Sequence, residues 1–145
     1  MVRDEAERSL HDALCVLRSL IKKRGLLPGG GAIEIEIWRA LEEKAQSLRG
    51  VQAMVMQEYA RALEVIPFAL SQNCGLSPVR VVTELRNKHL KGLKFAGLKA
   101  RTGQIVDNAL EHKIMQPALV TTSALTLSTE VTRMILKIDD LIDSR

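Results

Sequence analysis

Aromatic side chains are scarce in this chain, which has one Trp, one Tyr and two Phe among 145 residues. Proteins that bind single strands without sequence preference stack bases on aromatic rings, and this composition offers few of them. Cysteine is equally rare, because Cys15 and Cys74 stand alone without the C-x-x-C or histidine spacing of a zinc site. Two lone thiols are typical of a reducing compartment. We therefore expect no metal site and a cytoplasmic protein.

Long apolar runs are absent as well, and the longest falls far short of the roughly 20 residues that span a membrane. The chain does not open with a basic segment, an apolar segment and a small-residue cleavage site, so we expect no secretory signal. Apolar residues still make up 46% of the sequence, which is enough for an aliphatic core. These features predict one soluble domain, or one domain with a small appendage, and no membrane partner.

Positive charge exceeds negative charge by 4, but basic and acidic residues are interleaved along most of the chain. The basic clusters are Lys22–Arg24 and a looser one over Arg86–Lys99, and neither alternates with aromatic residues. Cations at Lys22–Arg24 also suit the C-terminal end of a helix. We therefore expect no nucleic-acid partner.

Apolar residues recur at three- and four-residue spacing through Arg3–Lys23, which predicts an amphipathic helix with its apolar stripe facing a core. The stripe consists of Ala6, Leu10, Ala13, Leu14, Leu17 and Leu20 or Ile21. Apolar spacing and turn residues predict further helices over about 32–47, from 51 to about 73 with a kink or break at Pro67, and over 78–91 with Ser77 as N-cap and Pro78 first. Pro117 is expected to start another helix to about Leu136, although its richness in Thr, Ser and Ala also allows part of it to be a strand.

Two segments have sequence patterns typical of strands instead. Residues 94–107 consist of short stretches that are interrupted by glycine and in which apolar and polar residues partly alternate. This pattern predicts a small β-hairpin. Lys137–Asp143 alternates well enough to be a terminal strand, although so short a strand needs a partner. The fold class is therefore mainly α with a small amount of β structure.

The first two predicted helices are joined by Pro28 and the triplet Gly29–Gly31. Three glycines lose much backbone entropy on folding, so they indicate either a hinge or a backbone that closely approaches a ligand. A glycine-rich loop before a helix can bind an anion. No Lys and Ser/Thr pair follows as in a Walker A loop, and no strand is expected before the glycines as in a dinucleotide fingerprint. A plain turn between helices remains the alternative.

No sequence motif places acid–base side chains close together. If Leu10, Leu14 and Leu17 face a core, Asp12 lies on the opposite, polar face of the helix, where a solvated carboxylate is usual. His11, His89 and His112 do not stand at metal-binding spacing from one another or from the cysteines. The residues by themselves thus predict a helical domain with a joint near Gly29, and they do not indicate a function.

Several stretches taken together resemble a group II chaperonin in their order and spacing. They are Glu5–Leu14, Gly29–Ala32 with Glu34–Glu36, Glu64–Pro67, Asn73–Gly75 and Lys137–Asp140. A subunit of that family is much longer, with an equatorial ATP-binding domain, an intermediate hinge domain and an apical client-binding domain. The resemblance implies that residues 1–28 are an intermediate-domain helix and hinge, and that residues 29–145 are the C-terminal half of the equatorial domain.

The resemblance also implies roles for individual residues. Asp12 matches the catalytic aspartate that positions the water attacking the γ-phosphate of ATP. Gln116 stands where many relatives carry an acidic residue beside the ribose, and an amide can still bond a hydroxyl. The implied nucleotide-binding residues are Gly29, Gly30, Gly31, Ala100, Arg101, Ile114 and Gln116.

The family's phosphate loop and its magnesium-binding aspartate match nothing in this sequence. ATP or ADP with Mg is thus implied for the full-length subunit, and none is expected to bind this chain tightly. ATP hydrolysis coupled to protein folding is likewise expected only in the assembled full-length subunit. The implied partners are other chaperonin subunits in a double ring, and unfolded client proteins held by the apical domain. The alternative function is a non-catalytic helical interaction module.

Overall fold

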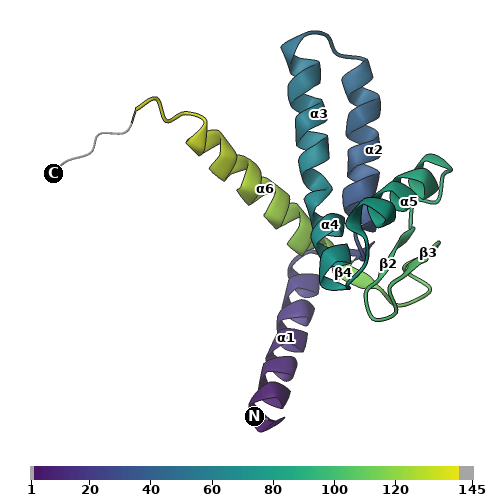
Figure 1. Cartoon of the computed structure of the whole chain (residues 1–145). Helices are drawn as coiled ribbons and strands as arrows, with labels where there is room; N and C mark the ends of the chain where they lie inside the picture. The colour runs from purple at the N-terminus through teal and green to yellow at the C-terminus, as the bar shows by residue number, and fades with distance from the viewer. Residues whose placement is uncertain (1, 141–145) are drawn as a thin grey trace. The chain divides into compact units, whose positions relative to one another are not determined.

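The computed structural model describes residues 2–140 as six helices and four short strands (Figure 1). Its residues form two compact units. The central unit is Leu27–Met115, and the terminal unit combines residues 1–26 with residues 116–145. The expected domain boundary between residues 28 and 29 stays a prediction.

Four helices and one β-hairpin build the central unit. The helices are α2 (Ala32–Gln46), α3 (Val51–Leu63), α4 (Val65–Asn73) and α5 (Pro78–Leu90). Helices α2 and α3 lie side by side as a hairpin (Figure 1). Strands β2 (Gly97–Lys99) and β3 (Gln104–Val106) are antiparallel, with Leu98 opposite Ile105. The predicted helices and the predicted hairpin are therefore confirmed in this unit.

The helix boundaries of the central unit follow from proline and glycine. The predicted break near Pro67 is confirmed, and it lies at Glu64, between α3 and α4. A proline ring clashes with the carbonyl four residues earlier, which here belongs to Leu63 at the end of α3. Pro78 opens α5 and Ser77 is its N-cap residue, both as predicted, although the Ser77 side chain makes no capping hydrogen bond. The fixed φ of proline is enough to start the helix.

The core of the central unit is aliphatic, as the composition indicates. Its buried cluster joins α2, α5 and β2 through Ile35, Val81, Val82, Leu85 and Leu98. Trp38, Leu70, Cys74, Leu76 and Ile105 pack around that cluster. The hairpin is thus held against the helices by its own buried side chain at Leu98.

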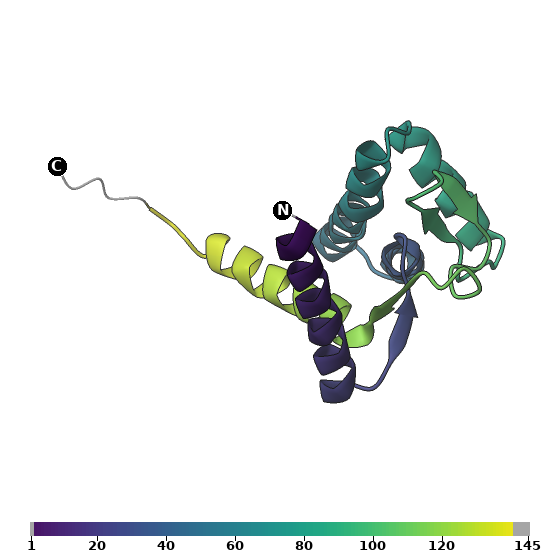
Figure 2. The ribbon, with the colours of Figure 1, turned by 90° about the horizontal axis from the view of Figure 1, so that it is seen from below.

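The terminal unit contains α1 (Val2–Lys22) and α6 (Ala118–Ile135), which contact each other. The two helices diverge along their length (Figure 1, Figure 2), so each covers little of the other. Helix α1 has no buried residue, and Leu10, Leu14 and Leu17 are 68%, 65% and 55% exposed. The prediction that this stripe faces a core is wrong for the described chain, because a single diverging helix cannot cover it.

Two strands were not predicted. β1 (Leu26–Pro28) and β4 (Met115–Pro117) pair with each other, and the division between the units falls within them. Strands of three residues are too short to show alternation. Because β1 directly precedes the glycines, the expectation that no strand stands there is wrong.

The predicted terminal strand is also wrong as far as the structure describes it. Residues 137–140 form a turn and irregular chain after α6, and residues 141–143 lie outside the described residues. Alternation alone does not make a strand when no partner strand is present. None of the helices within residues 2–140 has the length and apolar character needed to cross a membrane.

Candidate functional site

The three glycines form a tight turn, here called the glycine turn, that is bonded to two distant segments. The amide of Gly29 donates to the carbonyl of Ile114 at 2.9 Å, and the amide of Leu98 donates to the carbonyl of Gly30 at 2.8 Å. Gly30 and Gly31 have φ values of 68° and 80°, in the left-handed region that favours glycine. Helix α2 begins immediately after this turn.

The close packing of the turn explains why these positions are glycine. A Cβ on Gly30 would lie 2.4 Å from the carbonyl oxygen of Leu98, and a Cβ on Gly31 would lie 2.6 Å from Cβ of Pro67. Neither position has room for a side chain. The glycines are therefore required by the chain's own packing, a reason that stands beside the hinge and the ligand approach considered from the sequence.

A pocket of about 520 Å³ opens beside the glycine turn, entirely within the central unit. Its size is within the range of small-molecule sites, about 300–1,000 Å³. Its lining consists of Gly30, Leu70, Leu98, Lys99, Ala100, Arg101, His112, Lys113, Ile114 and Met115. Four predicted site residues therefore meet here, namely Gly30, Ala100, Arg101 and Ile114. Gly29 and Gly31 belong to the same turn without lining the pocket.

The lining combines apolar walls with positive charge. Leu98 and Ile114 supply apolar surface, while Lys99, Arg101 and Lys113 supply cations at the rim. Such a site can accept a flat apolar ring together with an anionic group. Sequence reasoning missed the two lysines, although both directly adjoin residues that it named.

Lys113 has an unusual backbone. It has a φ of 57°, and among the described residues it is the one non-glycine residue with positive φ. The tight turn around it is closed by hydrogen bonds from the amide of Lys113 to the carbonyl of Leu110 at 3.0 Å and from the amide of Ile114 to the carbonyl of Ala109 at 2.9 Å. Strained residues of this kind concentrate at functional sites. No local sequence signal marks this one.

The remaining two predicted site residues belong to the terminal unit. The side chain of Asp12 is 76% exposed on α1, with the Nδ1 atom of His11 at 3.8 Å from one carboxylate oxygen. Gln116, in β4, donates from Nε2 to the hydroxyl of Thr121 at 2.9 Å. The exposure of Asp12 agrees with the expectation of a solvated carboxylate on the polar helix face.

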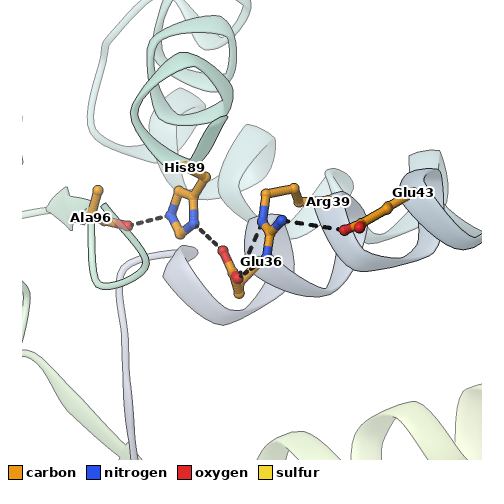
Figure 3. Close-up of polar contacts among 5 residues, drawn as sticks. All are labelled: Glu36, Arg39, Glu43, His89 and Ala96. Carbon is orange, nitrogen blue, oxygen red and sulfur yellow. Dashed lines mark hydrogen bonds and ion pairs between the residues drawn. The ribbon is translucent and has the colours of Figure 1, made fainter. Parts of the chain in front are cut away.

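A partly buried polar network joins helices α2 and α5 to the residue that precedes β2 (Figure 3). His89, at the end of α5, is 1% exposed, and its ring contacts the Oε2 atom of Glu36 through Nδ1 and the carbonyl of Ala96 through Nε2, each at 2.9 Å. Arg39 donates to Oε1 of Glu36 from Nη2 at 2.7 Å and from Nε at 3.2 Å. The sequence did not predict the contact between His89 and Glu36, because the two residues are distant in sequence and no local pattern joins them.

The network changes the acidity of Glu36. Burial by itself raises the pKa of this carboxyl group, but hydrogen bonds and positive charge from Arg39 and His89 outweigh burial, so the pKa lies below its ordinary value. The hydrogen bond and charge of Glu36 in turn raise the pKa of Arg39. Glu36 is therefore an ionised carboxylate at neutral pH.

Metal ligands are not clustered in the part of the chain that the structure describes, where no three His, Cys, Asp or Glu side chains come together. Cys15 is exposed and Cys74 is half-buried, and both are free thiols. Cys15 Sγ lies 3.8 Å from Nδ1 of His11 on the exposed surface of α1.

Comparison with known proteins covers the whole chain. Residues 1–145 match the TCP-1/cpn60 chaperonin family. The chain is 56% identical to T-complex protein 1 subunit delta of Arabidopsis thaliana, 54% to that of Saccharomyces cerevisiae and 52% to that of Homo sapiens, each over all 145 residues. It spans 27% of the length of these relatives.

A solved structure gives the same result. The open-state monomer of a group II chaperonin from Methanococcoides burtonii matches with a TM-score of 0.82 at 40% identity, over 94% of this chain and 34% of that one. Within the family, the segments Thr83–His89 and Gln116–Pro117 most resemble the delta subunit of the eukaryotic cytosolic chaperonin, and the delta relatives confirm that resemblance. The fold is therefore a largely helical chaperonin fold with small strands, and the chain belongs to the TCP-1/cpn60 chaperonin family.

Proposed function

We propose that this chain supplies part of the ATP-binding pocket of a chaperonin subunit that assists the folding of other proteins. The observation that supports this most is the pocket of about 520 Å³, where Gly30, Ala100, Arg101 and Ile114 meet. These residues come from the glycine turn, from the turn that follows β2 and from the segment before β4. The family resemblance assigns the same four positions to the nucleotide.

The pocket residues fit an adenine nucleotide in chemical character. The apolar side chains of Leu98 and Ile114 can pack against the base, while Lys99, Arg101 and Lys113 favour the anionic groups. Mg²⁺, when bound, would neutralise phosphate charge. It would be held by the phosphates and by residues of the subunit beyond this chain, because it usually needs few protein ligands when phosphates are present.

Asp12 is proposed as the hydrolytic carboxylate. Its side chain is largely exposed on α1, so it is free to accept a hydrogen bond from a water molecule and orient that water for attack on the γ-phosphate. Positioning a water molecule is useless unless the phosphates are also held. We therefore propose that the chain alone has negligible ATPase activity and at best weak nucleotide affinity.

The wider setting is proposed from the relatives, of which this chain spans about a quarter. The intact subunit would assemble with other chaperonin subunits in a cytoplasmic double ring. Unfolded clients would be bound by the apical domain, which matches no part of this chain. Coupling between hydrolysis and client folding would require all of these parts.

A second candidate is a non-catalytic helical interaction module. The exposed apolar stripe of α1, which includes Leu10, Leu14 and Leu17, favours it because apolar surface of this kind usually meets another protein. A stable oligomer that forms at micromolar concentration and ignores nucleotide would support this function. Sedimentation velocity with and without ATP distinguishes the two candidates.

The decisive experiment compares ATP binding and turnover in two settings. For the chain alone we expect no turnover and a dissociation constant weaker than about 1 mM, which is roughly 4 kcal/mol of binding free energy. The second setting is a full-length delta relative in which these 145 residues replace their counterpart. There we expect Asp12→Ala to lower hydrolysis by about 100-fold or more while nucleotide still binds.

Two further variants separate binding from hydrolysis. Arg101→Ala should weaken nucleotide binding in the full-length setting, because it removes a pocket cation. Glu7→Ala, on the same helix as Asp12, should leave both properties unchanged. Turnover by the chain alone that depends on Asp12 would show that these residues build a phosphate site by themselves, and the proposal would then fail.

A further inference from the structure

His89 is enclosed by groups that accept hydrogen bonds. Its ring is fully buried, and it lies between the carbonyl oxygen of Ala96 and the carboxylate of Glu36, at 2.9 Å from each (Figure 3). A backbone carbonyl can only accept, so the Nε2 atom must carry a hydrogen. The tautomer is therefore fixed on that side of the ring.

The other side of the ring faces a carboxylate. A neutral imidazole with hydrogen on Nε2 would direct the lone pair of Nδ1 at Oε2 of Glu36. That contact is favourable only if Glu36 is protonated, but Oε1 of the same carboxylate already accepts two hydrogen bonds from the guanidinium of Arg39. A carboxylate held in this way stays ionised, so Nδ1 must also carry a hydrogen.

We infer that His89 is a buried imidazolium which donates from both ring nitrogens and thereby fixes the pocket-lining strand β2 to helix α2. It acts as a positioning residue, because it is not among the residues that line the pocket. Its two hydrogen bonds join α2 at Glu36, α5 at His89 itself, and the residue that precedes β2, Ala96.

The two hydrogen bonds of His89 complete a closed set of links between β2, the glycine turn and α2, which border one wall of the pocket. Ala96 leads into β2, whose Leu98 amide donates to the carbonyl of Gly30 at 2.8 Å, and Gly31 leads into α2, which carries Glu36. The placement of Gly30 and Leu98 in the pocket wall therefore depends on both hydrogen bonds that the imidazolium donates. The part of this inference that concerns ligand binding rests on the proposed nucleotide function, whereas the protonation state does not.

Other charged groups near His89 have partners of their own. On α2, Arg39 also contacts Glu43 at 3.5 Å. On α5, the Nζ atom of Lys88 pairs with Asp107, which follows β3, at 2.6 Å. Glu36 is thus the charged group that faces the ring directly, and it is the group whose removal should change the ring's protonation.

The test is ring ¹⁵N NMR on the 145-residue chain between pH 6 and pH 9. An ordinary exposed imidazole has lost its extra proton by about pH 8. We expect both ring nitrogens of His89 to show the ¹⁵N shift of nitrogens that carry hydrogen at pH 8, whereas a neutral ring would show one nitrogen of each kind. A His89 ring with one unprotonated nitrogen at pH 8 would overturn the inference, and this experiment needs no variant to fold.

Variants test the positioning role. In Glu36→Gln we expect His89 to become singly protonated at pH 8, and the Leu98 amide to exchange its hydrogen about tenfold faster at constant pH. His89→Gln should have the same effect on Leu98. Lys88→Gln, which removes a positive charge one residue earlier on α5, should leave Leu98 exchange within about twofold of the parent.

Unchanged exchange at Leu98 in Glu36→Gln, in a chain that keeps its folded spectrum, would overturn the positioning role. None of these measurements contains nucleotide. A failure of the proposed ATP function therefore leaves the imidazolium intact, and a neutral His89 leaves the ATP function untouched.

Discussion

In the central unit, Ile35, Leu85 and Leu98 are almost completely buried, whereas α1 of the terminal unit has no buried residue at all. Every buried Ala, Val, Leu and Ile among the described residues lies in the central unit. Both units contain amphipathic helices, so the difference does not come from helix periodicity. It comes from the number of elements available to cover each apolar face.

The comparison shows what a helical pattern can and cannot specify. In the central unit, α2, α5 and β2 meet around one cluster, so each apolar side chain has neighbours on several sides. In the terminal unit, two diverging helices leave Leu10 and Leu14 about two-thirds exposed. The stability of the described chain should therefore come mainly from the central unit, and four predictions test this difference.

The largest expected effect is that of Leu85→Ala, because Leu85 is fully buried in the core cluster. We expect the free energy of unfolding to fall by about 2–5 kcal/mol. The matched change in the terminal unit is Leu14→Ala, which should alter it by less than about 0.5 kcal/mol. Urea unfolding followed by fluorescence of the single tryptophan, Trp38 in α2, measures both. Equal losses would remove the distinction between the units.

The next effect concerns the glycine turn. Gly30 and Gly75 have φ values of 68° and 72°, but a Cβ on Gly30 would meet the Leu98 carbonyl at 2.4 Å whereas a Cβ on Gly75 would meet nothing within 4 Å. Gly75→Ala should therefore show the cost of the backbone conformation alone, about 1–2 kcal/mol. Gly30→Ala should cost about 1–3 kcal/mol more because of overpacking.

Both glycine variants can be measured by the same urea titration. If Gly30→Ala were no worse than Gly75→Ala, the close packing of the turn would contribute nothing to stability. The glycine at position 30 would then have to be explained by a hinge or by a ligand.

A smaller effect should appear at acidic pH. The pKa of Glu36 in the folded chain lies below its ordinary value near 4.5, so its ionised form stabilises the fold fully above that pH. This contribution should be lost as pH falls from about 4.5 through the folded value, and it should amount to about 1 kcal/mol, a typical net hydrogen bond. Unfolding followed by Trp38 fluorescence between pH 7 and pH 3 measures it.

Glu36→Gln is the control for this pH dependence. It removes the titrating group, so the central unit should be less stable at pH 7 and should lose less stability on acidification than the parent. A variant with an acid slope as steep as the parent's would assign the dependence to other carboxylates.

The smallest expected effect is a gain in stability when Lys113 is replaced by glycine. Glycine adopts the φ of 57° found there without steric cost, so Lys113→Gly should relieve strain, partly offset by the added freedom of the unfolded chain. We expect the free energy of unfolding to rise by about 0.5 kcal/mol. Lys113→Ala should give no gain, because alanine keeps its Cβ. Urea unfolding of the pair distinguishes strain from loss of charge.

Much of the secondary structure could be predicted from the sequence because its signals are local. Periodic apolar residues predicted α1 and α3, and Pro67 and Pro78 marked where helices break and begin. The paired strands β1 and β4 could not be predicted in this way. Each has three residues, and their partners are far apart in sequence.

Less of the candidate site could be predicted from the residues themselves. Gly30, Ala100, Arg101 and Ile114 were named through the family resemblance, and their meeting in one pocket depends on tertiary packing. The Glu36–His89 contact was missed for the same reason, since it joins two helices across the core. The apolar stripe of α1 was identified correctly, but periodicity cannot say which molecule covers it.

The hydrogen bonds of the glycine turn also set an order of events during folding. Gly29 and Gly30 are bonded to Ile114 and Leu98, residues that a ribosome adds much later. Closing such long loops costs chain entropy, and no local contact repays it in advance. Helices α2 and α3 can form as soon as they are synthesised, whereas the pocket cannot form until Ile114 has been synthesised. The candidate site is thus among the last parts of this chain to become native.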